Sequence, residues 1–159
     1  MAMANFKSGQ WFGIVAIALV CVSCTKAPDR PKVTKVSGQV FVENKPAKGA
    51  LITLVPMQAP EEVAKSWKFG YPRATVGADG KFQVSTYELG DGAPPGEYRL
   101  TIIWPVMEMV EGPDGELVEG EKPVFPPQNR INTKYSEPGQ TPLNIKVEEK
   151  PLEIPKYEL

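Results

Sequence analysis

Prolines and glycines interrupt almost the whole of this 159-residue chain after a short N-terminal stretch. All 17 prolines lie at or after residue 28, and 12 of the 14 glycines follow residue 37. Proline removes a backbone hydrogen-bond donor and glycine weakens regular elements, so interruptions this frequent leave little room for long helices. What remains is a series of short runs with β-strand character separated by turns, which predicts an all-β fold.

Seven of these runs have the apolar alternation of a β-strand. They cover residues 36–43, 50–56, 73–76, 81–86, 97–104, 143–149 and 152–158. The run 50–56 is apolar on both faces, which favours a strand with neighbours on both sides. Seven short strands at hairpin spacing predict a seven-stranded antiparallel β-sandwich over residues 35–159.

Turn chemistry joins these runs. Residues 44–49 are predicted to form a turn in which Pro46 fixes φ and Gly49 permits a positive φ. Asp79 and Gly80 lie between two β-prone runs, and Asp-Gly at such a place is a strong hairpin signal. Tyr98 is expected to donate a hydrogen bond to a nearby backbone carbonyl, as tyrosines do in other sandwiches.

Residues 1–23 have the layout of an export signal. Residues 11–22 form an uncharged apolar run that is short for a membrane span of ~20 residues and suits the core of a secretory signal. Ser23 directly precedes Cys24, and a small residue before such a cysteine resembles the bacterial lipobox, in which the cysteine is lipidated. We therefore predict a lipoprotein-type signal peptide, lipidation of Cys24 and a polar, Pro-containing linker at 24–34.

This layout predicts an exported protein of the bacterial cell envelope, held at a membrane through its lipidated cysteine. Two alternatives stay open. Cleavage near Ser23 without lipidation would release a soluble secreted or periplasmic protein, and a retained apolar segment would anchor the chain directly.

The side chains that most enzyme chemistry requires are missing from the predicted domain. The chain has no histidine, and its two cysteines, Cys21 and Cys24, precede the domain. Thiol nucleophiles, disulfides and His or Cys metal sites are therefore excluded over residues 35–159. The hydroxyls of Ser85, Thr86 and Ser136 lack a histidine base and any recognisable nucleophile motif. We expect no catalytic residue, no cofactor and no metal, and a hydrolase is the weakest of the functional hypotheses.

A net charge of −1 supplies no basic face for nucleic acid, so no nucleic-acid partner is expected.

Several short motifs follow one another in a recognisable order. They are V-S-G-Q-V at 36–40, N-K-P-A-K-G-A at 44–50, A-D-G-K-F at 78–82 and P-G-E-Y-R-L-T at 95–101. Together they resemble the carboxypeptidase regulatory-like domain, a group of transthyretin-like sandwiches, and above all its small bacterial lipoproteins. The resemblance covers about residues 34–159. It implies a non-catalytic domain, because in metallocarboxypeptidases this domain accompanies a separate zinc peptidase domain. Related sandwiches sometimes bind carbohydrate.

Three aromatic residues alternate at Trp67, Phe69 and Tyr71. In an extended segment their rings would lie on one face and could stack on sugar rings or on a Pro-rich peptide. The alternative, which we favour, is that they cap an open end of the sandwich, where large apolar side chains bury the most area. A carbohydrate- or peptide-binding module that uses this row is the second functional hypothesis.

The segment 107–121 contains six carboxylates and no basic residue. Calcium prefers such oxygen ligands, but the spacing matches no calcium-binding loop. Residues 113–116, Pro-Asp-Gly-Glu, suit a hairpin turn, so we expect a solvated acidic β-hairpin or a mobile loop. The leading functional hypothesis is a non-catalytic, lipid-anchored envelope β-sandwich that acts as a structural or interaction module, with an envelope protein or polysaccharide as partner.

Overall fold

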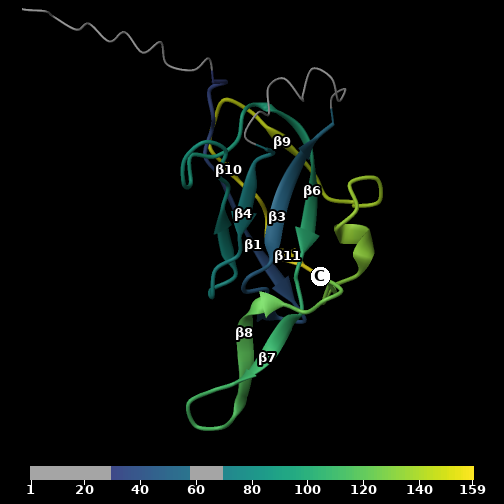
Figure 1. Ribbon diagram of the computed structural model, residues 1–159. Helices are drawn as coiled ribbons and strands as arrows, with labels where there is room; N and C mark the ends of the chain where they lie inside the picture. Colours follow the sequence, from purple (N-terminus) through teal and green to yellow (C-terminus); the bar gives the residue numbers. More distant parts are fainter. Residues whose placement is uncertain (1–29, 58–69) are drawn as a thin grey trace, which may run out of the picture.

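The computed structural model describes residues 30–57 and 70–159 (Figure 1). Apart from the 3-10 turn η1 (Thr133–Tyr135), every regular element in these residues is a β-strand, which confirms the all-β prediction. The same residues contain no helix with the length and apolar character that crossing a membrane requires. The predicted signal peptide, Cys24 and most of the predicted linker lie outside the described residues.

The first sheet is built around β1 (Val36–Val42). This strand pairs antiparallel with β2 (Lys45–Pro46) and β5 (Lys81–Gln83). It pairs in parallel with β10 (Leu152–Glu153) and β11 (Tyr157–Glu158), two short strands at the C-terminal end of the chain. Segments more than a hundred residues apart are thereby joined in one sheet.

The second sheet has the order β4-β3-β6-β9, and all its neighbours are antiparallel. Its strands are β4 (Arg73–Thr75), β3 (Leu51–Pro56), β6 (Gly96–Ile103) and β9 (Asn144–Val147). The position of β3 between β4 and β6 confirms that this doubly apolar run has neighbours on both sides.

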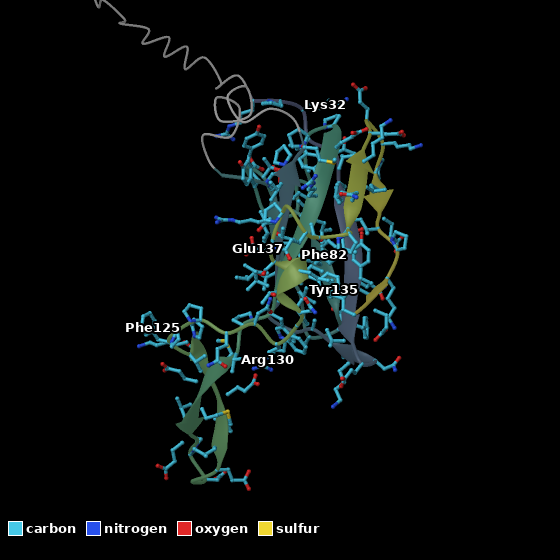
Figure 2. All side chains as sticks on the ribbon, turned by 90° about the vertical axis from the view of Figure 1, so that its right-hand side faces the viewer. Lys32, Phe82, Phe125, Arg130, Tyr135 and Glu137 are labelled. Carbon is cyan, nitrogen blue, oxygen red and sulfur yellow. The ribbon has the colours of Figure 1, made fainter. Side chains whose placement is uncertain are left out.

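The core contains side chains from both sheets in a single cluster. Alternate residues along each strand point into it, as the two-residue period of a β-strand requires. The fully buried members include Val36, Val40, Ile52, Leu54, Leu100, Ile102, Val147 and Ile154. Two sheets that share one apolar core, with the charged side chains of the described residues outside it (Figure 2), are consistent with a β-sandwich.

Each of the seven predicted runs contains a strand, but the described residues form eleven strands in all. The last predicted run is divided into β10 and β11, with Pro155 between them. The other additions are the two-residue β2 and the pair β7 (Met107–Glu111) and β8 (Leu117–Pro123).

The turn predicted at 44–49 is two turns. Glu43 and Asn44 form the first, with φ of 50° and 63°, and Pro46 follows it in β2, paired with Phe41. Gly49, with φ of 81°, belongs to the second turn, in which the Ala50 N–H donates to the Ala47 carbonyl at 3.0 Å. The positive φ expected for Gly49 is confirmed, whereas the role given to Pro46 as a turn residue is wrong.

The turn at 77–80 connects the two sheets rather than closing a simple hairpin. β4 pairs with β3 and β5 pairs with β1, and the flanking chains meet at an isolated bridge between Arg73 and Ser85. Val76 and Phe82, on either side of this turn, are both buried in the shared core. Gly80 is needed at this turn, since a Cβ there would lie 2.6 Å from the Phe41 ring.

The chain enters the sandwich at Thr34, the last residue of the predicted linker. Thr34 and Ala93 exchange two backbone hydrogen bonds, of 2.8 and 2.9 Å. The chain passes so close to Gly92 that a Cβ there would lie 1.8 Å from the Thr34 carbonyl oxygen. Ala93, beside this entry point, comes shortly before β6 in the sequence. The entry point therefore lies at the end of the sandwich opposite the hairpin β7–β8 (Figure 1).

Candidate interaction surface, the β7–β8 arm

The hairpin β7–β8 forms a separate two-stranded sheet that projects from the end of the sandwich where β6 finishes (Figure 1). We call residues 107–123 the arm. Its register places Val110 opposite Val118, with an irregularity between Met107 and Met109. The acidic segment 107–121 is therefore a β-hairpin, one of the two forms that its sequence predicts.

Local sequence explains why the arm folds back on itself. Pro113 and Asp114 are favourable turn residues, and Gly115 adopts a φ of 78° that glycine tolerates without strain. The Gly112 N–H donates to the Glu116 carbonyl at 2.8 Å, which closes the turn. Gly120 leaves room for a valine on the other strand, since a Cβ there would lie 3.0 Å from Val110 Cγ1.

The arm exposes apolar side chains on both of its faces. Of the ten large apolar residues that are exposed in the described part of the chain, five lie between residues 107 and 125. They are Met109, Val110, Leu117, Val118 and Phe125. Val110 and Val118 share one face, whereas Met109 and Leu117 lie on the other, each opposite a glutamate. An isolated two-stranded hairpin is marginally stable in water, and exposed apolar patches mark interaction sites.

The arm is far more acidic than the chain as a whole. It has six carboxylates and one basic residue, Lys122, and hence a charge of −5, against −1 for the whole chain. Within residues 30–57 and 70–159, Glu119 is the one arm carboxylate that forms an ion pair. No group of three or more acidic side chains in the described residues is arranged to hold a metal ion.

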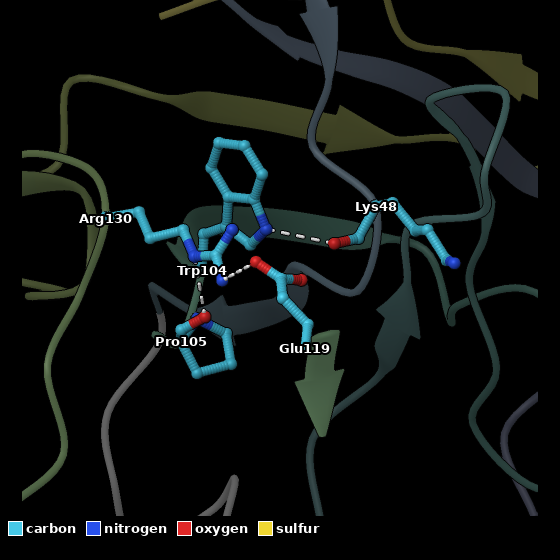
Figure 3. Close-up of polar contacts among 5 residues, drawn as sticks. All are labelled: Lys48, Trp104, Pro105, Glu119 and Arg130. Carbon is cyan, nitrogen blue, oxygen red and sulfur yellow. Dashed lines mark hydrogen bonds and ion pairs between the residues drawn. The ribbon is translucent and has the colours of Figure 1, made fainter. Parts of the chain in front are cut away.

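Arg130 connects the base of the arm to the sandwich (Figure 3). Its Nη2 lies 2.6 Å from Glu119 Oε1, and its Nε donates to the Pro105 carbonyl at 3.1 Å. Its guanidinium carbon lies 5.2 Å from the centre of the Trp104 ring, within the range of a cation–π interaction. The Trp104 Nε1–H donates to the Lys48 carbonyl at 2.9 Å, so the ring is itself held against the sandwich.

Backbone pairing continues from β6 into the arm. Pro105 forms a bridge with Asn129, and the Arg130 N–H donates to the Trp104 carbonyl at 2.8 Å. The Asn129 side-chain oxygen accepts from the Trp104 N–H at 2.9 Å. Phe125, 91% exposed, lies on the side of the arm base away from the sandwich, whereas Arg130 lies between the two (Figure 2). These contacts fix the direction in which the arm leaves the sandwich.

The structure describes one member of the predicted aromatic row. Tyr71 lies just before β4 and is 41% exposed, whereas Trp67 and Phe69 are outside the described residues. A broad open groove of 1020 Å³ runs across β3, β4 and β5, and its polar lining includes Arg73, Thr75, Lys81 and Gln83. The lining of this groove includes no residue of the arm.

The hydroxyls considered for nucleophilic chemistry make hydrogen bonds within turns. Ser85 Oγ accepts from the Gly90 N–H at 2.9 Å, and Thr86 Oγ1 donates to the Gly92 carbonyl at 2.6 Å. Ser136 Oγ donates to the Thr133 carbonyl at 2.8 Å.

The Tyr98 hydroxyl donates to the Pro94 carbonyl at 2.8 Å, which confirms its predicted structural role. Burial raises the pKa of this hydroxyl, and the nearby Tyr87 raises it further.

Sequence reasoning identified the acidic hairpin but not the residues that hold it. The sequence pattern indicated no role at the arm for Trp104 or Arg130. The two are 26 positions apart, and nothing in the local pattern predicts their contact. The run of apolar residues between the carboxylates was the available signal for an exposed apolar surface.

Comparison with known proteins assigns no family. No protein-family model matches the chain, and no curated protein is similar to it. Among solved structures, part of a 9R-lipoxygenase from Cyanothece is similar, with a TM-score of 0.37 and 13% sequence identity. The similarity covers 80% of this chain and 16% of the lipoxygenase, and it carries no implication for activity.

Proposed function

We propose that this protein is a non-catalytic interaction module of the bacterial cell envelope, anchored through a lipid on Cys24, and that the β7–β8 arm is its binding element. The observation that carries the proposal is the concentration of exposed apolar side chains on a projecting hairpin. Such surfaces are costly in water and mark sites that another molecule covers. The layout of residues 1–23 supports export and lipidation.

We also propose that the sandwich belongs to the transthyretin-like group and is a carboxypeptidase regulatory-like domain. The support is the order of its motifs along the chain. V-S-G-Q-V falls in β1, A-D-G-K-F spans the turn into β5, and P-G-E-Y-R-L-T covers the start of β6. A non-catalytic role agrees with this resemblance and with the absence of histidine from the sequence.

A carbohydrate-binding module is the second candidate function. It is favoured by the open groove across β3, β4 and β5, whose Arg73, Lys81 and Gln83 offer hydrogen-bond donors to sugar hydroxyls. Tyr71 precedes this groove in sequence, and the row Trp67, Phe69 and Tyr71 would supply stacking rings. Pull-down on insoluble envelope polysaccharides tests it. Retention that is lost when all three aromatics are replaced by alanine would favour this function over the arm.

The proposed function is tested in cells that produce the full chain. Labelled palmitate should enter the wild-type protein and not Cys24→Ser, and equal labelling of both would refute lipid anchoring. A photo-crosslinking residue in place of Leu117, on the arm, should form a specific protein adduct in the envelope. The matched control replaces Leu89, which is 98% exposed but lies outside the arm. Equal adducts at both positions, or none at either, would refute the arm as binding element.

A further inference from the structure

We propose that the partner of the arm is a cationic, extended polypeptide segment that pairs with the free edge of β7 and alternates Lys or Arg with apolar residues. This inference rests on the proposed function and names the partner's chemistry. It follows from three properties of the arm, namely its unpaired edge, its charge and the order of its side chains.

The edge of β7 is available for pairing. In the two-stranded sheet each strand has one paired and one unpaired side. In an antiparallel hairpin, cross-strand pairs with backbone hydrogen bonds alternate with pairs that have none. The bond from the Gly112 N–H to the Glu116 carbonyl identifies that pair as hydrogen-bonded. The N–H and C=O groups of Met109 and Glu111, which belong to the other kind of pair, therefore point toward the free edge of β7. Five residues of strand present about 17 Å of edge, which suits a short extended segment.

The charge of the arm selects a basic occupant. Glu108 and Glu111 lie on β7 without an ion-pair partner in residues 30–57 and 70–159, whereas Glu119 on β8 is paired with Arg130. The carboxylates on β7 therefore remain without a neutralising charge, whereas on β8 the carboxylate of Glu119 is neutralised by Arg130. A Lys or Arg beside β7 would supply the missing charge.

The same charge disfavours two other occupants. Pairing the arms of two copies edge to edge would place two segments of −5 side by side, and like charges on neighbouring strands repel. An anionic lipid surface repels the arm for the same reason.

The order of side chains adds an apolar requirement. Along β7, Val110 lies on one face, and Met109 and Glu111 lie on the other. A strand added at this edge would place its residues alternately beside the face of Val110 and beside the face of Met109 and Glu111. Alternation of apolar and basic residues satisfies both faces, and the alkyl stems of Lys and Arg also cover Met109.

Binding of labelled peptides to the full chain, purified in detergent, tests the inference. The probes are three fluorescein-labelled peptides of about eight residues, close to the usual strand length. One alternates Lys with Val, one alternates Glu with Val, and one alternates Lys with Ser. Fluorescence anisotropy measures binding of each peptide at low and high salt. We expect the Lys-Val peptide alone to bind, and its affinity to fall as salt is raised.

Two variants of β7 locate the binding. Replacing both carboxylates, Glu108→Gln with Glu111→Gln, should weaken binding about fivefold, since each exposed charge pair contributes modestly. The matched control, Glu88→Gln with Glu149→Gln, should leave it unchanged. Met109→Pro removes an outward N–H from an edge strand and should abolish binding while the core stays folded. Circular dichroism checks that each variant is folded.

Several outcomes would overturn the inference. The first two are a Lys-Val peptide that does not bind and a Lys-Ser peptide that binds equally well. The other two are an equal loss of affinity in the Glu88→Gln, Glu149→Gln control and an arm-dependent dimer in sedimentation. If one of these occurs while the residue-117 adduct still forms in cells, the arm remains the binding element and only the partner's chemistry is wrong. If that adduct is absent, the proposed function itself fails.

Discussion

The guanidinium of Arg130 is shared between Trp104 and the arm. Its carbon lies 5.2 Å from the centre of the Trp104 ring, and its Nη2 lies 2.6 Å from Glu119 on β8. One side chain therefore contacts an aromatic ring bound to the sandwich and a carboxylate on the arm. The direction of the arm depends on this contact as well as on the backbone pairing at its base.

Replacing Arg130 with alanine should loosen the arm more than it destabilises the sandwich. The variant loses the Glu119 ion pair and the contact with Trp104 but keeps the backbone bond to the Trp104 carbonyl. We expect faster amide hydrogen exchange over residues 107–123 and a loss of about 1 kcal/mol or less in the free energy of unfolding. Hydrogen-exchange mass spectrometry checks this. Lys150→Ala removes the exposed pair with Glu148 and is the control, and similar exchange in both variants would contradict the prediction.

Tyr98→Phe should lower the free energy of unfolding by about 1 kcal/mol, the usual net value of a buried hydrogen bond. The substitution leaves the ring in the core and removes the bond to the Pro94 carbonyl. Urea unfolding of both proteins gives the difference. Tyr135→Phe, in a partly buried ring at the edge of the core, serves as the comparison and should change stability less. A midpoint for Tyr98→Phe that coincides with that of the wild type would show that the bond contributes nothing.

Stability should fall as the pH rises above about 10, the ordinary pKa of tyrosine. Burial raises the pKa of Tyr98 in the folded protein, so the folded state keeps a proton that the unfolded chain has lost, and unfolding becomes more favourable. Burial also raises the pKa of Tyr157. The stabilisation from these buried, protonated tyrosines is thus fully present below the pKa of tyrosine in the unfolded chain, and it is lost progressively as the pH rises above that value. Unfolding midpoints measured across alkaline pH should decline less steeply in Tyr98→Phe, and parallel declines would contradict this origin.

Glu43→Asn should raise the free energy of unfolding by about 0.5–1 kcal/mol, because asparagine accepts a left-handed backbone more readily than glutamate. Glu43 and Asn44 adopt φ of 50° and 63° in the turn between β1 and β2. Thermal unfolding measures the gain. Glu149→Asn is a control at an exposed position without positive φ. A lower melting temperature for Glu43→Asn would mean that the glutamate side chain stabilises this turn.

Strand positions were predictable where one face is buried. Ala50, Ile52 and Leu54 alternate in sequence and are all fully buried in the structure, because a two-residue period matches the pleat of a half-buried strand. The two-residue β2 escaped prediction, since it is too short to show any period. The partners of each strand were also out of reach: the parallel pairing of Val36 with Leu152 depends on tertiary packing across the whole domain.

The candidate site was predictable only in part. Pro113, Asp114 and Gly115 predicted the hairpin turn, because turn chemistry is local. That the hairpin projects from the sandwich could not be predicted, since its direction depends on Arg130, which follows β8 and contacts Trp104 before β7. The predicted aromatic row is untested at Trp67 and Phe69, which lie outside the described residues.

The chain enters the sandwich at one end and the arm leaves it at the other, so the length of the sandwich separates the two. Thr34 enters beside Ala93, just before β6, and the arm leaves where β6 ends. Eight residues of β6 and five of β7 span about 27 Å and about 17 Å, respectively. For a chain held through the tether proposed at Cys24, the sandwich would act as a spacer, and its length together with that of the linker would set the distance from the membrane to the arm.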